Sequence, residues 1–177
     1  SASLATLINE ALLYMIKTGK KILENEDIEI AKNKLEFGKK QIKILDDEQK
    51  DILATYQASK AFISKTKVAL LDESVQKLNS TFPSYLELCE NIRRDLAGFI
   101  GVEVIKKEKY AVNPNDLENA ENIANEIVNR YKMATSTQEL LLDIKNDLRT
   151  KISSNIDEII RLKEIMLKNE VITLEDF

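Results

Sequence analysis

The stretch from Asn115 to Phe177 contains no glycine and no proline. Its apolar residues recur at alternating three- and four-residue steps for most of that length, which is the pattern of an amphipathic helix. At 1.5 Å per residue, an unbroken helix of this length would extend about 80 Å. The sequence therefore predicts one very long, coiled-coil-like helix over these residues.

Turn-forming residues are scarce throughout the chain, which has 177 residues but four glycines and two prolines. Folds rich in β-strands need a turn after about every dozen residues. We therefore expect an all-α fold, an elongated antiparallel bundle of about four or five helices. We expect one domain over residues 1–177, with a candidate boundary inside it near residues 112–115.

Two segments before the long run also have helical periodicity. The first covers residues 4–23 and predicts an amino-terminal helix. The second covers residues 28–82 and leaves two alternatives: one helix of about 50 residues, or two helices separated by a break at Asp46-Asp47. We prefer the continuous helix. It should end before Pro83, because the residue that precedes a proline avoids the helical conformation.

A further helix is expected to begin near Ser84. Gly98 and Gly101 lie inside it and indicate either a bend or a close contact with another helix. At the other end of the chain, the tail is apolar enough to dock on the bundle. Thr173 and Asp176 have the spacing of a capping box and predict one final helical turn.

Polar residues interrupt the apolar seam of the predicted long helix at Gln138, Lys145 and Asn155. Such residues can fix the register of a self-associating helix. Alternatively, the seam drifts around the helix, so that neighbours such as Leu142 and Ile144 take over the buried positions. We favour the drifting seam, while self-association remains a second prediction.

Several kinds of chemistry are disfavoured by composition. The chain has no histidine, the commonest acid–base group and transition-metal ligand, and it has no phosphate-binding loop, dinucleotide fingerprint or zinc-finger spacing. Its single cysteine, Cys89, is expected to be a small buried hydrophobic residue and is compatible with the cytoplasm. We therefore expect no enzyme, no cofactor and no metal site. An enzyme that uses carboxylates alone would need several inward-facing acids around one cavity.

The charge balance limits the partners. The chain has 26 basic and 30 acidic residues, a formal charge of −4, which argues against specific nucleic-acid binding. Arg93 and Arg94 form the one adjacent arginine pair, and Lys106 and Lys107 follow at the end of the same helix. These four residues are the candidates for contact with a partner or an anion. The alternative is that the arginines form surface ion pairs with Glu90 and its neighbours.

Two segments, in the same order along the chain, carry a family resemblance. Residues 69–73 (Ala-Leu-Leu-Asp-Glu) lead to Asn79-Ser80-Thr81-Phe82-Pro83, with Tyr85 just beyond. Residues 137–142 (Thr-Gln-Glu-Leu-Leu-Leu) are followed by Leu148-Arg149-Thr150. These segments resemble the toxic-anion (tellurite) resistance family of bacterial helical proteins, which has similar runs around an asparagine-threonine-isoleucine-proline turn. The resemblance implies a stress-associated bundle protein, without a catalytic site that could be transferred to this chain.

The function predicted from these observations is a non-enzymatic scaffold or a module for protein–protein interaction that presents exposed helix faces. One alternative is a protein associated with a membrane surface or a pore, because the polar faces of the amino-terminal helices are rich in lysine. Another is a toxic-anion resistance function, which the family resemblance implies. We expect a protein partner and a cytoplasmic location, with peripheral membrane contact left open.

Overall fold

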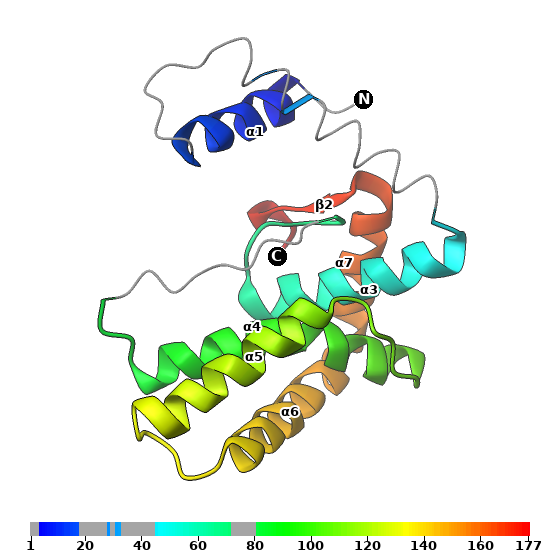
Figure 1. Ribbon diagram of the computed structural model, residues 1–177. Coiled ribbons are helices and arrows are strands. Elements are labelled where there is room, and N and C mark those ends of the chain that lie inside the picture. Colours follow the sequence, from blue (N-terminus) through cyan, green and yellow to red (C-terminus); the bar gives the residue numbers. More distant parts are fainter. Residues whose placement is uncertain (1–3, 18–27, 29–30, 33–44, 72–80) are drawn as a thin grey trace. The chain divides into compact units, whose positions relative to one another are not determined.

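The computed structural model describes residues 4–17, 28, 31–32, 45–71 and 81–177 (Figure 1). The chain forms two compact units, residues 1–46 and residues 47–177. In the first unit, helix α1 covers Leu4–Lys17 and buries Ala11. This confirms the predicted amino-terminal helix over the described residues.

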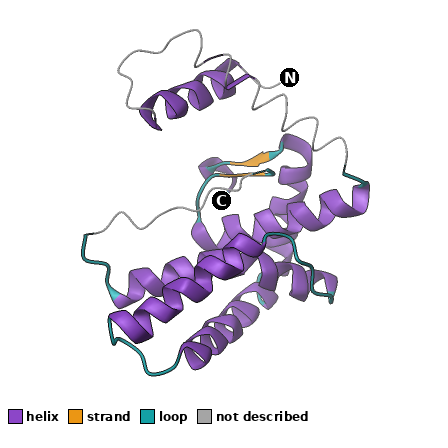
Figure 2. Cartoon of the chain, viewed as in Figure 1, coloured by secondary structure: helices purple, strands orange, loops and turns teal. Residues whose placement is uncertain are grey.

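The second unit is almost entirely helical (Figure 2). Helix α3 packs against α4 and α7, and α4 also packs against α5 and α6. The all-α fold class is therefore confirmed. The elements in chain order are α3 (Asp47–Ser64), β1 (Val68–Ala69), α4 (Tyr85–Lys106), α5 (Pro114–Asn125), the π-helix η1 (Glu126–Arg130), α6 (Thr137–Ser153), α7 (Ile156–Asn169), β2 (Val171–Ile172) and the 3-10 turn η2 (Leu174–Asp176).

The prediction of one very long carboxyl-terminal helix is wrong, because this stretch divides into several helices. Lys132 has a left-handed backbone, with φ of 55°, between η1 and α6. The Ser136 side chain then caps α6 by accepting a hydrogen bond from the Glu139 N–H at 3.3 Å. Asn155 separates α6 from α7. Serine and asparagine can end helices without glycine or proline, because their side chains bond to free backbone groups.

The preferred continuous helix over residues 28–82 is also wrong. Helix α3 begins at Asp47, which confirms the alternative of a break at Asp46-Asp47. It ends at Ser64 and not just before Pro83 as predicted, and Lys65 follows with a left-handed φ of 50°. Residues 33–44 and 72–80 lie outside the described part of the chain.

Capping boxes begin two of the described elements, and the one predicted at Thr173 and Asp176 is confirmed. Ser84 and Glu87 form a capping box at the start of α4. Thr173 and Asp176 form the same motif at η2. Both pairs satisfy backbone N–H groups that a helix start leaves free.

A short antiparallel pairing of β1 with β2 was not predicted. Val68 lies opposite Ile172, and the Leu70 N–H donates to the Glu170 carbonyl at 3.0 Å. Ile172 is fully buried, which confirms that the tail docks. This pairing joins the end of the chain to the segment that follows α3.

The apolar seam of α6 follows a four-residue spacing. Leu140, Ile144, Leu148 and Ile152 are buried, whereas Gln138 is exposed. Ile144 therefore takes a buried position as the drifting seam predicts, whereas Leu142 is 55% exposed and does not. Cys89 is also buried, as predicted. None of the described helices is both long and apolar enough to cross a bilayer.

Candidate functional site

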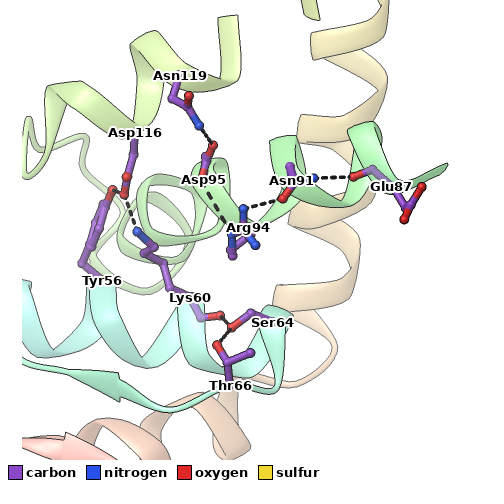
Figure 3. Close-up of polar contacts among 10 residues, drawn as sticks. All are labelled: Tyr56, Lys60, Ser64, Thr66, Glu87, Asn91, Arg94, Asp95, Asp116 and Asn119. Carbon is purple, nitrogen blue, oxygen red and sulfur yellow. Dashed lines mark hydrogen bonds and ion pairs between the residues drawn. The ribbon is translucent and has the colours of Figure 1, made fainter. Parts of the chain in front are cut away.

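Three buried polar side chains meet between α3 and α5 (Figure 3). The Tyr56 hydroxyl donates to Asp116 Oδ2 at 2.5 Å, and the Lys60 ammonium donates to the same oxygen at 2.6 Å. Lys60 is 9% exposed, and Tyr56 and Asp116 are 1% exposed. One carboxylate oxygen thus holds an ammonium group and a phenol away from water. We call these three residues the Tyr56–Lys60–Asp116 cluster.

Local helix geometry explains how the cluster forms. Tyr56 and Lys60 are four residues apart, so both lie on one face of α3. Asn113 caps α5 and Pro114 occupies its first turn, which places Asp116 near the amino-terminal end of that helix. A carboxylate is stabilised there, because the helix dipole is positive at this end.

Two glycines of α4 allow this helix to approach the cluster. A Cβ atom added to Gly98 would lie 2.5 Å from the ring of Tyr56, and one added to Gly101 would collide with the Ser59 hydroxyl. Phe99 packs edge-on against the Tyr56 ring, with the ring centroids 5.2 Å apart. This confirms that Gly98 and Gly101 mark a close helix contact, and it fixes the orientation of Tyr56.

A second buried carboxylate, Asp95 of α4, lies beside the cluster (Figure 3). Asn119 of α5 donates to it, and Arg94 Nε lies 3.8 Å from its other oxygen. Burial raises the pKa of Asp95 above its usual value, although Asn119 and Arg94 act in the opposite direction. The negative charge of the nearby Asp116 also raises the pKa of Asp95.

The hydroxyl of Tyr56 acts as a proton donor. Burial raises the pKa of Tyr56 well above its usual value, and the hydrogen bond to Asp116 and the negative charges of Asp116 and Asp95 raise it further. The phenol is therefore protonated at neutral pH. It can hold the carboxylate in place but cannot serve as an anionic ligand or base.

Gln57 follows Tyr56 on α3 and is also buried. Its amide Nε2 donates to the carbonyl oxygen of Leu70 at 3.2 Å, which ties α3 to the chain just after β1. An amide does not accept a proton at neutral pH, so Gln57 is no general base.

The layout of the cluster can be compared with a catalytic zinc site. In the His-Glu-x-x-His motif, two ligands four residues apart on a helix bind zinc, and a carboxylate can be the third ligand. The residues present do not fit zinc. The chain has no histidine, Lys60 bears a positive charge that repels a metal ion, and Tyr56 keeps its proton. The described residues contain no group of three histidine, cysteine or acidic side chains suited to a metal ion.

The arginines predicted to contact a partner or an anion take part in contacts within the chain. Arg93 lies 3.0 Å from Glu90 and 3.2 Å from Asp147, which confirms the alternative of surface ion pairs with Glu90. Arg94 contacts Asn91 and Asp95. Arg94 therefore contacts the buried carboxylate of Asp95, whereas Arg93 lies on the surface between α4 and α6.

The two lysines predicted with these arginines lie at the other end of α4. Lys106 pairs with Asp51 of α3, which also lies 2.9 Å from Lys163 of α7. Lys107 ends α4 in a left-handed conformation, with φ of 61°. The structure does not bring the four residues together, and their role in binding an anion or a partner stays a prediction.

Sequence reasoning missed the Tyr56–Lys60–Asp116 cluster. The four-residue spacing of Tyr56 and Lys60 was a usable signal, because it puts both side chains on one helix face. The cap formed by Asn113 and Pro114 could have placed Asp116 at the start of a helix. Nothing in the sequence pattern alone pairs that helix start with α3.

Comparison with known proteins gives distant relatives. No protein-family model matches the chain. The chain is 28% identical over 152 residues to the ATP-dependent zinc metalloprotease FtsH 1 of Bdellovibrio bacteriovorus, a match that covers 75% of this chain and 23% of that protein. It is 26% identical over 153 residues to the ATP-dependent zinc metalloprotease FtsH of Cupriavidus metallidurans, covering 76% and 23%. The chain thus spans less than a quarter of the length of the curated relatives it matches.

Proposed function

We propose that this chain is a non-enzymatic helical module that is related to a segment of zinc metalloproteases and acts by binding a protein partner. The observation that carries the proposal is the pairing of Lys60 with Asp116 inside the fold. A zinc protease needs a metal ion and a base that activates water. Here the cation beside the carboxylate is an ammonium group of the protein itself.

The remaining groups of the cluster support a structural role. Gln57 is held by the Leu70 carbonyl, and the raised pKa of Tyr56 keeps its hydroxyl protonated. Asp116 accepts two hydrogen bonds and is 1% exposed, so water reaches it poorly. The cluster therefore joins α3 to α5, and function is expected at the protein surface.

Large apolar side chains gather at the start of α4. Phe82 is 89% exposed and Leu86 is 65% exposed, with the exposed Tyr85 between them. Apolar groups this close together on a surface are typical of contact sites for other proteins. We call Phe82, Tyr85 and Leu86 the α4 amino-terminal surface and propose it as the site of partner binding.

A proteolysis assay tests the non-enzymatic part of the proposal. The purified chain is incubated with an unfolded protein substrate and added Zn²⁺, and fragments are measured by mass spectrometry. We expect no cleavage. Cleavage that stops with a chelator and with Asp116→Asn would contradict the proposal, because it would place a working metal centre at the cluster.

Cross-linking in the source cell tests the binding part. We expect Leu86→Glu to lose a specific cross-linked protein that the unmodified chain retains. Leu174→Glu is the matched control, because Leu174 is a similarly exposed leucine, at 69%, on η2. Equal cross-linking by both variants and the unmodified chain would contradict partner binding through the α4 amino-terminal surface.

The other predicted functions stay predictions. Most of the lysines that favour a membrane-surface function fall within residues 18–27 and 33–44, which lie outside the described part of the chain. The toxic-anion resistance function, self-association and a cytoplasmic location likewise have no further support.

A further inference from the structure

The cluster has the donor layout of a metalloprotease metal site, although its chemistry differs. Tyr56 and Lys60 have the same spacing as the two histidines of His-Glu-x-x-His, and Gln57 directly follows Tyr56, as the glutamate follows the first histidine. Asp116 comes from a neighbouring helix, as the third ligand of such a site can. In Figure 3 the Tyr56 hydroxyl and the Lys60 ammonium both point to Asp116.

The direction of electron-pair donation is reversed relative to a metal site. Three metal ligands would each direct a lone pair at a central cation. Here Tyr56 and Lys60 instead each direct a proton at the carboxylate of Asp116. The positive charge that a carboxylate needs when it is buried is supplied by Lys60.

The surroundings are also negative enough for a cation. Asp95 is buried beside the cluster, and the negative charge of Asp116 and the positive charge of Lys60 both affect its pKa. Removal of the Lys60 ammonium would leave two buried carboxylates without this neighbouring positive charge. Such an arrangement attracts a cation that side chains of suitable chemistry can bind.

We propose that the ammonium group of Lys60 occupies the place of the metal ion in a metalloprotease-like site, and that restoring three side chains creates a transition-metal site there. This inference rests on the proposed function and extends it, because it states that the buried cluster takes the place of a metal site. It predicts that the fold still holds the geometry of a site with two ligands from α3 and one from α5.

The test is the triple variant Tyr56→His, Gln57→Glu and Lys60→His in the full chain. Histidine is smaller than tyrosine, so the backbone of Gly98 leaves room for it. Titration with Co²⁺, followed by visible absorption, should give a 1:1 tetrahedral complex in the triple variant and none in the wild-type chain. Zn²⁺ should displace the Co²⁺, in keeping with its preference for such sites.

Two controls identify the ligands. Adding Asp116→Asn to the triple variant should weaken Co²⁺ binding by about 10- to 100-fold or more, since even changes beyond the direct ligands have effects of that size. The pair Asn146→His and Thr150→His places histidines four residues apart on the exposed face of α6. That pair should bind Co²⁺ only weakly, and Asp116→Asn should not change its affinity.

Several results would overturn the inference. One is a folded triple variant that binds Co²⁺ no better than the α6 control. If the triple variant is unfolded without metal, circular dichroism with added Co²⁺ decides, because metal binding should restore its helices; failure to do so counts against the inference. Stoichiometric Zn²⁺ binding by the wild-type chain through Asp116 would also overturn it. Proteolysis by the wild-type chain is a separate measurement and tests the proposed function.

Discussion

At the scale of single residues, Lys60 and Asp116 form a buried ion pair, and removing either side chain alone should destabilise the fold. Lys60→Met would leave the buried carboxylate of Asp116 without its cation, which typically lowers the free energy of unfolding by about 3–5 kcal/mol. Adding Asp116→Asn should recover much of that loss, since no unpaired charge remains. Urea unfolding of both variants measures the difference. Equal losses in the single and double variants would show that the charge pairing contributes little.

Asp95 predicts a pH dependence at the same scale. Its pKa is raised above the usual 3.8, chiefly by burial, so the folded protein binds this proton more tightly than the unfolded chain. Stability from this group is therefore greatest below about pH 3.8 and falls as pH rises through the folded pKa. Asp95→Asn keeps an acceptor for Asn119, so the variant should gain stability over wild type as pH rises.

Unfolding curves of wild type and Asp95→Asn between about pH 3 and pH 7 measure this difference, which spans the usual titration range of aspartate. Asp143→Asn is a suitable control, because Asp143 is an exposed aspartate on α6. A stability difference between wild type and Asp95→Asn that does not change with pH would contradict the assignment.

At the scale of elements, the approach of α4 to α3 depends on small residues that face each other. Gly101→Ala places a methyl group against the Ser59 side chain, and such overpacking typically costs about 1–3 kcal/mol. Ser59→Gly removes the obstructing hydroxyl and Cβ, at the cost of its bond to the Thr55 carbonyl. Gly101→Ala should therefore destabilise less in the Ser59→Gly background than in wild type.

Thermal unfolding of the wild type, the two single variants and the double variant completes this cycle. A coupling energy near zero would mean that the two helices separate readily to accept the methyl group. The same cycle separates the contact from the general cost of glycine in a helix interior, which affects Ser59→Gly in both backgrounds.

Element boundaries also show what the sequence could and could not predict. Thr173 is predicted as a cap because Asp176 follows it at three residues, whereas Ser84 is predicted only as a helix start, although Glu87 follows it at the same spacing. Ser136 and Glu139 also have this spacing, and Ser136 caps α6, a signal that the prediction of one long helix did not use. Lys132 and Glu170 follow helices and have a left-handed backbone, although lysine and glutamate do not favour that conformation. The composition of the chain therefore does not reveal these helix ends.

At the scale of the whole molecule, helix content followed from composition, whereas the buried cluster depended on contacts distant in sequence. Tyr56 and Lys60 meet Asp116 across 60 and 56 residues of chain, respectively. Periodicity identifies the buried face of each helix but not which faces meet. Gly98 and Gly101 are a partial exception to this limit. A glycine inside a helix indicates that another element lies close to it, but not which element.

Asp51 joins three helices of the second unit, since it pairs with Lys106 of α4 and Lys163 of α7. Burial alone would raise the pKa of Asp51, but the two lysines outweigh it and lower this pKa below the usual 3.8. Its contribution to stability is thus present above about pH 3.8 and is lost as pH falls through the folded pKa. The slope is opposite to that expected from Asp95.

Asp51→Asn should therefore destabilise the chain at neutral pH and have a smaller effect in acid. Hydrogen exchange should show faster opening of α3, α4 and α7 together in this variant, because one carboxylate contacts lysines from both partner helices of α3. Asp147→Asn is the matched control, since its carboxylate pairs with Arg93 at the surface between α4 and α6. Faster exchange confined to α3 would contradict this prediction, because it would show that Asp51 does not couple the opening of α3 to that of α4 and α7.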